Sequence, residues 1–384
     1  MPYYRQVGDV PRKRHTLHRV AGDIVSEELF GLHGFSGASS LLYHRTSPSA
    51  LVRIEAVDFA EPRFAANQPV RPYHLVTSKI EHASNDAVLG RSYLFGNDDL
   101  RVAWVVAVGD GSLYRNAAGD ELVYVQSGSA CCESVFGRLD AHAGDYVVVP
   151  AGTTHRWRAD TSCEMLVMEA RGGHVDVPAR YRGAVGQMLE GAPFSERDVR
   201  GPDELVHEEG DEVPVVVRTR AGLSRLVHAN HPFDVVGWDG CCYPWAFAIH
   251  DFEPVVGRIH QPPPVHQTFE GPQFTVCSFV PRLFDTDPNA MKIPYHHANV
   301  DTDEVLFYSA GDFMSRAGAG IGVGSITIHP AGFVHGPQPG SLERSMPIDR
   351  TAEVAVMIDA FAPLGLAAAA HDVSDDTYVR SWSR

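Results

Sequence analysis

Two stretches of this chain repeat one pattern of residues, and this repeat limits the possible folds more than any other feature. In both copies a Glu is followed after six residues by a Gly, at Glu121 and Gly128 and again at Glu304 and Gly311. Beyond a variable hairpin, each copy continues with Gly, five residues, Pro, one residue, Gly, two residues and His. These positions are Gly144, Pro150, Gly152 and His155 in the first copy and Gly324, Pro330, Gly332 and His335 in the second. The match predicts two copies of one supersecondary unit.

The residues within each copy are typical of β-strands. Apolar side chains alternate along the chain, as at Leu122 and Tyr124 and again at Val305 and Phe307, which is the period of a half-buried strand. The glycines and the Pro-x-Gly segments indicate tight turns, the last of which leads to the His. The 35 Gly and 26 Pro among 384 residues also favour many short strands.

The two motifs resemble the signature motifs of the cupin superfamily, whose unit is a small double-stranded β-helix or jelly roll. The resemblance implies an all-β bicupin, with two jelly-roll domains in one chain and few helices. We expect the N-terminal cupin in residues 1–200 and the C-terminal cupin in residues 201–384, with the boundary in the acidic, loop-like segment 190–215.

A cupin metal site needs neutral imidazoles and a carboxylate that converge from neighbouring strands, with open positions for substrate and O2. The second copy can supply this set, and its predicted ligands are His297, Glu304 and His335. His296 competes with His297, because adjacent residues of a strand face opposite ways. Asp303 competes with Glu304, although Glu304 is the residue that aligns with Glu121 of the first copy.

The first copy lacks a complete ligand set. It keeps Glu121 and His155, but Tyr114 stands seven residues before Glu121, where the second copy has His297 before Glu304. A phenol in place of an imidazole leaves no ordinary triad. We therefore predict that the N-terminal cupin is structural, with its metal site lost, and that the C-terminal cupin carries the metal.

The residues upstream of the second copy narrow the reaction, which the cupin fold alone does not specify. The segment from His231 to Asp285, with its PPPVHQTF element, and the later PYHHAN and VHGP elements resemble the homogentisate 1,2-dioxygenase family, most densely over residues 231–337. The resemblance implies an Fe(II) enzyme that opens the ring of homogentisate with both atoms of O2. Its product would be maleylacetoacetate, in tyrosine and phenylalanine breakdown. Two His and one carboxylate also suit non-haem Fe(II) and oxygen chemistry.

The resemblance implies roles for further residues. It makes His266 the general base that takes the phenolic proton, with His260 as the alternative. His329 lies six residues before His335, an even offset that lets both face one cavity along a regular strand. We expect substrate contacts at His329, Tyr308 and His296, and Arg282, Lys292 and Arg316 are candidates for holding a substrate carboxylate.

Two other functions stay open. Phe313 stands where the family has a Tyr that contacts substrate, so the substrate can instead be gentisate or another hydroquinone, although Tyr308 could replace that Tyr. The alternative from another class is a bicupin that binds a small molecule without catalysis.

The net charge of −16 disfavours nucleic acid and anionic membrane surfaces as partners. No signal segment and no apolar run near the ~20 residues of a membrane span occur in the sequence, so we expect a cytoplasmic protein. The six cysteines show no CxxC spacing, which predicts reduced thiols. The resemblance also implies a homo-oligomer.

Overall fold

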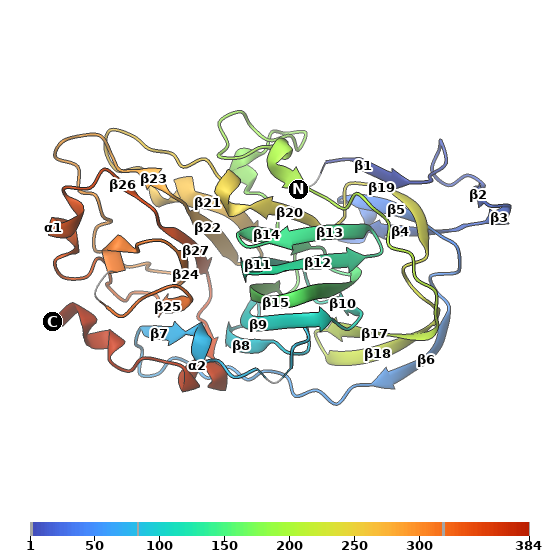
Figure 1. The fold of residues 1–384 in the computed structure, drawn as a ribbon, viewed down its shortest axis with the longest axis horizontal. Coiled ribbons are helices and arrows are strands. Elements are labelled where there is room, and N and C mark those ends of the chain that lie inside the picture. Colours follow the sequence, from blue (N-terminus) through green and yellow to red (C-terminus); the bar gives the residue numbers. More distant parts are fainter. Residues whose placement is uncertain (1–2, 83, 317–318, 384) are drawn as a thin grey trace.

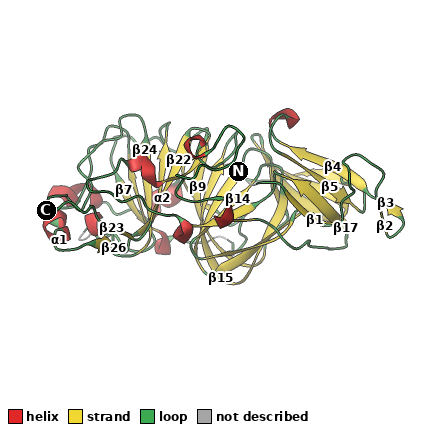
Figure 2. Ribbon diagram, turned by 90° about the horizontal axis from the view of Figure 1, so that it is seen from above, coloured by secondary structure: helices red, strands yellow, loops and turns green. Residues whose placement is uncertain are grey.

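A computed structural model describes residues 3–82, 84–316 and 319–383 of the chain. Strands make up most of its regular structure, and the helices are short segments between or beside them (Figure 1, Figure 2). The prediction of an all-β fold with few helices is confirmed.

The largest sheet has 14 strands and contains the first copy of the repeat. Its strands are β6 (Leu51–Ala56), β8 (Ser92–Gly96), β9 (Leu100–Asp110), β10 (Tyr114–Asn116), β11 (Glu121–Ser127), β12 (Ser129–Ser134), β13 (Gly137–His142), β14 (Asp145–Val149), β15 (Thr154–Ala170), β16 (Val199–Arg200), β17 (Asp211–Thr219), β18 (Gly222–Asn230), β20 (Trp245–Ala248) and β28 (Gly365–Leu366). The main path is β16-β20-β14-β11-β15-β10-β17-β18-β6. Gly128, which follows β11, has a φ of +77°, the left-handed conformation that its turn requires.

A second sheet of six strands contains the second copy of the repeat and lies at the C-terminal end of the molecule (Figure 1). Its strands are β7 (Tyr73–Val76), β21 (Gln267–Gly271), β22 (Phe274–Phe279), β24 (Asp303–Ala310), β25 (Ser325–His329) and β27 (Val354–Ala360), in the order β21-β22-β27-β24-β25-β7. In each copy the Glu of the motif therefore lies on a central strand, β11 or β24, between two antiparallel neighbours.

The remaining elements are peripheral. A four-stranded sheet has the order β1 (Arg5–Gly8), β19 (Val235–Gly240), β5 (Ser39–His44) and β4 (Ser26–Gly31), and two ribbons pair β2 (Arg19–Val20) with β3 (Asp23–Ile24) and β23 (Arg282–Leu283) with β26 (Arg350–Thr351). The α-helices are α1 (Ser341–Ser345) and α2 (Ala368–Asp372), and the 3-10 turns are η1 (His33–Phe35), η2 (Thr77–Lys79), η3 (Ala179–Tyr181), η4 (Glu196–Asp198), η5 (Ile249–Asp251), η6 (Pro263–His266), η7 (Met314–Arg316) and η8 (Tyr378–Ser383). Within the described residues, none of the helices has the length and hydrophobicity needed to cross a membrane.

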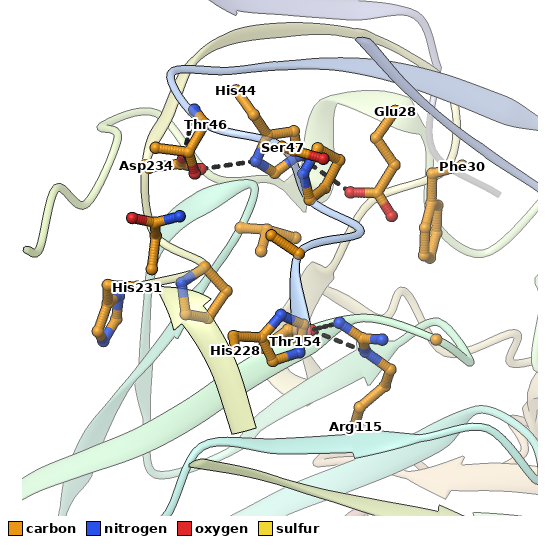
Figure 3. A pocket seen from close by; sticks show the side chains of 16 residues that line it. Glu28, Phe30, His44, Thr46, Ser47, Arg115, Thr154, His228, His231 and Asp234 are labelled. Carbon is orange, nitrogen blue, oxygen red and sulfur yellow. Dashed lines mark hydrogen bonds and ion pairs between the residues drawn. The ribbon is translucent and has the colours of Figure 1, made fainter. Parts of the chain in front are cut away.

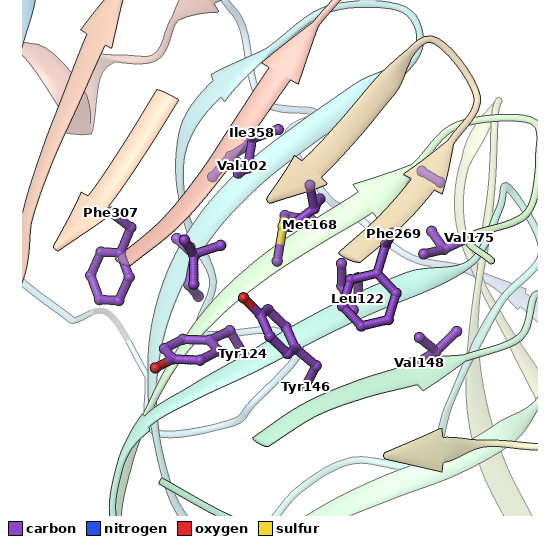
Figure 4. Packing of buried hydrophobic residues seen from close by; sticks show 14 of the residues in the cluster. Val102, Leu122, Tyr124, Tyr146, Val148, Met168, Val175, Phe269, Phe307 and Ile358 are labelled. Carbon is purple, nitrogen blue, oxygen red and sulfur yellow. The ribbon is translucent and has the colours of Figure 1, made fainter. Parts of the chain in front are cut away.

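The two large sheets share one hydrophobic core. Phe307 of β24 lies 5.6 Å from the ring of Trp104 on β9 and 6.0 Å from that of Tyr124 on β11, as Figure 4 shows for Tyr124. Tyr124 and Tyr146 carry their hydroxyls across this interface to Ser309 (2.7 Å) and Ser278 (2.9 Å). The second sheet is thus fixed against the first by buried contacts. All six cysteines are free thiols, as predicted.

Strand pairing crosses the predicted boundary near residue 200. β17 and β18 follow that boundary but pair with β10 and β6 of the first half. β7 belongs to the first half but pairs with β25 of the second, and β28 pairs with β8. The division into domains 1–200 and 201–384 stays a prediction, and these exchanges show that the two halves of the chain are interlocked.

A buried histidine joins the four-stranded sheet to the loop before β19 (Figure 3). His44 Nδ1 lies 2.7 Å from Asp234 Oδ1, and His44 Nε2 lies 3.0 Å from Glu28 Oε2. Burial alone would lower the pKa of His44, but hydrogen bonds to the two carboxylates outweigh it and raise the pKa to about 9. His44 is therefore charged at neutral pH.

Candidate metal centre

The structure brings together the three residues predicted as ligands. His297 and His335 face each other in an antiparallel bridge, each backbone N–H donating to the other's carbonyl at 2.9 Å. Glu304 lies on β24, with its Oε1 3.2 Å from His335 Nε2 and its Oε2 3.5 Å from His297 Nε2. One atom from each of the three lies within 4.8 Å of the others, a spacing that a single metal ion can span. Among the described residues, no other group of His, Cys, Asp and Glu meets this criterion.

Hydrogen bonds fix which nitrogen of each imidazole faces the centre. His335 Nδ1 lies 2.9 Å from the carbonyl of Phe333, and His297 Nδ1 lies 3.1 Å from that of Tyr295. A carbonyl only accepts, so each Nδ1 carries the proton and each Nε2 has a free lone pair. This is how metal-binding histidines are oriented. His335 Nε2 is buried and lacks a hydrogen-bond partner, which a metal ion would supply.

The structure separates the competing candidates by position. Asp303 accepts hydrogen bonds from the backbone N–H groups of Ala331 and Leu364, both at 2.8 Å, so it holds the turn after β25 rather than the centre. Asp120 of the first copy accepts the equivalent bond from Ala151. His296 is exposed, whereas His297 reaches Glu304.

The first cupin has the same frame but a different charge at its centre. Tyr114 stands opposite His155, as His297 stands opposite His335, so Tyr114 and His297 are equivalent positions. Arg91 occupies the space beside Glu121, with its Nη1 and Nη2 each 2.8 Å from a Glu121 oxygen. Its Nη1 also lies 2.6 Å from Glu169 Oε1. A guanidinium of the protein thus balances the carboxylates of this copy.

Glu304 has no such internal cation. It is 5% exposed, and no Arg or Lys of the described chain lies within ion-pair distance of it. Burial would raise the pKa of Glu304, but the imidazoles of His297, His329 and His335 around it hold it well below its ordinary value. A buried, ionised carboxylate beside two imidazole lone pairs is the donor set of a divalent cation. These residues fit a metal ion.

Two residues near Glu304 were not predicted from the sequence. Asp359 of β27 stands opposite Glu304 in the ladder, as Glu169 stands opposite Glu121. Burial and the charge of Glu304 raise the pKa of Asp359 to about 7. The signal was present, because an acidic residue followed by Ala recurs at Glu169 and Asp359. Tyr378 reaches His329 from the C-terminal turn η8, and no local pattern indicates this contact.

A cavity of about 400 Å³ opens beside the centre. Its wall includes His297, Glu304 and Asp359 together with His266 and His260. The three cations proposed for a substrate carboxylate also line it; these are Arg282, Lys292 and Arg316. The predicted base, two of the three predicted ligands and the candidate anion-binding groups therefore line one cavity.

His266 ends the turn η6 and packs on Phe279, with 4.6 Å between the rings. Its Nδ1 is buried and has no hydrogen-bond partner. Burial, together with Arg282 and His260, lowers the pKa of His266 to about 3. The side chain is neutral at neutral pH and can accept a proton, although its pKa is below the near-neutral value that we expected.

Three residues predicted to contact substrate are outside the described lining of the cavity. His329 is fully buried behind Glu304, and its ring stacks on that of His335 at 4.0 Å. Tyr308 is fully buried, with its hydroxyl 3.3 Å from Thr327 Oγ1 and its ring 5.1 Å from Phe313. His296 is exposed. Substrate contacts by His329, Tyr308 and His296 stay predictions.

Comparison with known proteins identifies the family of this chain. A family model described as "Cupin domain" matches residues 103–169. A protein of Saccharolobus solfataricus named "Putative dioxygenase SSO1533" is 40% identical over 386 residues, covering 100% of this chain and 99% of that protein. This chain belongs to the cupin dioxygenase family. The predicted cupin fold is thereby confirmed, and membership of a dioxygenase family implies a small-molecule substrate and O2.

More distant relatives of this cupin dioxygenase carry a specific name. Homogentisate 1,2-dioxygenase of Bradyrhizobium diazoefficiens is 25% identical over 287 residues, covering 70% of this chain and 62% of that enzyme. The enzyme of the same name from Caenorhabditis elegans is 23% identical, over 61% of this chain and 54% of its own length. The chain thus spans less than two thirds of these relatives. Among solved structures, a mutant of Bacillus subtilis oxalate decarboxylase OxdC aligns with 76% of this chain and 78% of its own, at 12% identity and a TM-score of 0.34.

Proposed function

We propose that this protein cleaves the ring of homogentisate with O2, using an Fe(II) ion held by His297, Glu304 and His335. The observation that carries the proposal is that this triad borders a cavity, with His297 and Glu304 on its wall together with His266 and three cations. Homogentisate gains both atoms of O2 and loses none, so the balanced product is its ring-opened form, maleylacetoacetate.

The triad leaves room for substrate and oxygen. Two imidazole nitrogens and one carboxylate occupy one side of the centre, and the cavity lies beside it. This is the ligand pattern of non-haem iron oxygenases. An Fe(II) ion held there would supply the one-electron chemistry that O2 needs to react with an aromatic ring.

His266 is the proposed general base. The hydroxyl of a hydroquinone-type ring must lose its proton as the substrate binds, and His266, which lines the cavity, would accept that proton at the unprotonated nitrogen of its ring. Its low pKa keeps the ring neutral before substrate arrives. An anionic substrate beside it would raise the pKa toward neutrality, because an opposite charge favours the imidazolium.

Arg316 is the group best placed to require an anionic substrate. Arg282 has Glu353 at 3.7 Å, and Lys292 Nζ donates to the carbonyl of Asp285 at 2.7 Å. Arg316 is only 5% exposed, donates to the carbonyl of Gly336, and has no carboxylate within ion-pair distance among the described residues. Arg316 therefore lacks a directly paired negative charge to offset the cost of its burial. The carboxylate of homogentisate would supply that charge.

The test uses the two copies of the repeat as each other's control. The protein is loaded with Fe(II) without air, homogentisate is added, ¹⁸O-labelled O2 is admitted, and oxygen uptake and product mass are followed. We expect two labelled oxygens in a ring-opened product. His335→Ala should abolish turnover. His155→Ala removes the equivalent buried imidazole of the first cupin. This variant should retain turnover.

Each other outcome has a defined meaning. Turnover of gentisate without turnover of homogentisate would keep the centre and change the substrate. Equal loss of activity in both variants, with both folded by circular dichroism, would refute the assignment of the reaction to the second cupin. Absence of iron in the wild-type protein after anaerobic loading would refute the enzyme proposal and favour a bicupin that only binds a small molecule.

A further inference from the structure

His329 links the predicted carboxylate ligand to the C-terminal turn of the protein. His329 Nδ1 lies 3.0 Å from Glu304 Oε1, and His329 Nε2 lies 2.9 Å from the hydroxyl of Tyr378. All three side chains are buried, with exposed fractions of 0% for His329, 1% for Tyr378 and 5% for Glu304. Water therefore does not compete strongly for these hydrogen bonds.

The chemistry of the three groups fixes the direction of both bonds. An ionised carboxylate only accepts, so His329 Nδ1 carries a proton and donates it to Glu304. In a neutral imidazole the other nitrogen is then an acceptor, and the Tyr378 hydroxyl donates to it. The chain of donors runs from Tyr378 through His329 to Glu304 Oε1. Rotation of the His329 ring would break it.

The turn that carries Tyr378 is itself anchored next to the centre. Trp382 Nε1 donates to the carbonyl of Gly336 at 3.0 Å, and Gln338 Nε2 donates to Ser381 Oγ at 2.9 Å. Gly336 follows the predicted ligand His335 directly. The segment Tyr378–Ser383 therefore contacts His329, which is hydrogen-bonded to Glu304, and also the backbone next to His335.

The first cupin shows that the repeat does not require this arrangement. The position opposite Glu121 on β14 is Val149, whereas the position opposite Glu304 on β25 is His329. Val149 has no polar group, and Glu121 is instead held by Arg91 and by Asn116 Nδ2 at 2.9 Å. The relay is found in the copy that has the ligand set for a metal.

We propose that Tyr378 is a positioning residue for the metal centre and acts through His329 to fix the carboxylate of Glu304. The inference rests on the proposed role of Glu304 as a metal ligand. Partners that orient a ligand in this way change metal affinity by about 10–100-fold when they are removed. Tyr378 is two residues away from Glu304 along the relay. Removal of its hydroxyl should therefore change the metal affinity by an amount near the lower end of this range.

The experiment titrates metal-free protein with Co²⁺ and measures the dissociation constant and the visible spectrum. Tyr378→Phe should weaken binding about tenfold and change the spectrum. Tyr146→Phe is the matched control, because it also deletes one buried tyrosine hydroxyl, whose 2.9 Å contact is to Ser278 and not to a residue of the relay. It should leave the affinity unchanged. In the His329→Ala background, Tyr378→Phe should have no further effect, as expected for groups that act in series.

The outcomes separate this inference from the function on which it rests. If wild-type protein binds no metal, the proposed centre is wrong. If wild-type protein binds Co²⁺ and Tyr378→Phe behaves as Tyr146→Phe does, the centre stands and the positioning role is refuted. An equal effect of Tyr378→Phe with and without His329 would also refute it, since Tyr378 would then act by anchoring the C-terminal turn alone.

Discussion

The guanidinium of Arg91 should be the most important single charge for the stability of the first cupin. Its side chain is 1% exposed and lies between Glu121 and Glu169, which are 0% and 2% exposed. Substitution by Met keeps most of the aliphatic volume and removes the charge. Two buried carboxylates would then face each other without a counter-ion.

The structure gives the size of the effect. Burial would raise the pKa of Glu121, but Arg91, with smaller contributions from His155 and Asn116, lowers it from an ordinary value of 4.5 to about 2, a difference that corresponds to about 3 kcal/mol at neutral pH. Breaking a buried ion pair by removing one partner costs about 3–5 kcal/mol in general. We therefore expect Arg91→Met to lower the free energy of unfolding by about 3–5 kcal/mol at pH 7.

The pH dependence has a defined sign. In the wild type the depressed pKa of Glu121 contributes stability that is complete above pH 4.5 and is lost as the pH falls toward 2. In Arg91→Met, burial instead raises the pKa of the carboxyls, so the folded variant is stabilised by protonation. The deficit of the variant should therefore be smaller at pH 5 than at pH 8.

Urea unfolding followed by tryptophan fluorescence tests both statements, because Trp104 and Trp157 are buried within this sheet. Arg53→Met is the control, since Arg53 pairs with Glu55 and Glu212 on the exposed surface and such pairs contribute little. A loss below about 1 kcal/mol that is the same at both pH values would refute the view that Arg91 balances these buried carboxylates.

Two further predictions concern the metal centre and the N-terminal sheet. Fe(II) added without air at a hundred times its dissociation constant should stabilise the wild type by about 2.7 kcal/mol in thermal unfolding, reversibly with chelator. It should not stabilise Glu304→Ala, and equal stabilisation would contradict the assigned ligand. The pKa of His44, raised from 6.5 to about 9, corresponds to about 3 kcal/mol that is present below pH 6.5 and lost as the pH rises through 9. The stability difference between the wild type and His44→Gln should therefore shrink between pH 6 and pH 9.5, and a constant difference would contradict the ion pairs with Asp234 and Glu28.

The repeat made the strands and the triad predictable because both depend on short-range spacing. Glu304 and Glu121 align by counting residues, and the structure places both on central strands, β24 and β11. The alignment of Tyr114 with His297 also holds in space, since each faces the His of its own copy. Local pattern was sufficient for these features.

The contacts that complete each centre come from distant segments and were not predicted. Arg91 lies 30 residues before Glu121, and Tyr378 lies 49 residues after His329. The pairing of β7 with β25 and of β28 with β8, each across the two halves of the chain, was likewise not predicted. Alternation of apolar residues shows that a segment is a strand but does not show which edge it will join. These features needed the three-dimensional structure.

The contrast between the two copies follows from how each satisfies a buried carboxylate. Glu121 is 0% exposed and Glu304 is 5% exposed, so neither can rely on water to stabilise its charge. The first copy supplies a guanidinium, which fills the space and leaves no position for another cation. The second copy supplies imidazoles, two of which donate their Nδ1 protons to carbonyls and turn a lone pair toward the carboxylate. Lone pairs do not neutralise a carboxylate, so the missing positive charge must be one that accepts them. A divalent metal ion would meet both demands, and its place depends on the absence, among the described residues, of a guanidinium paired with Glu304 as Arg91 is paired with Glu121.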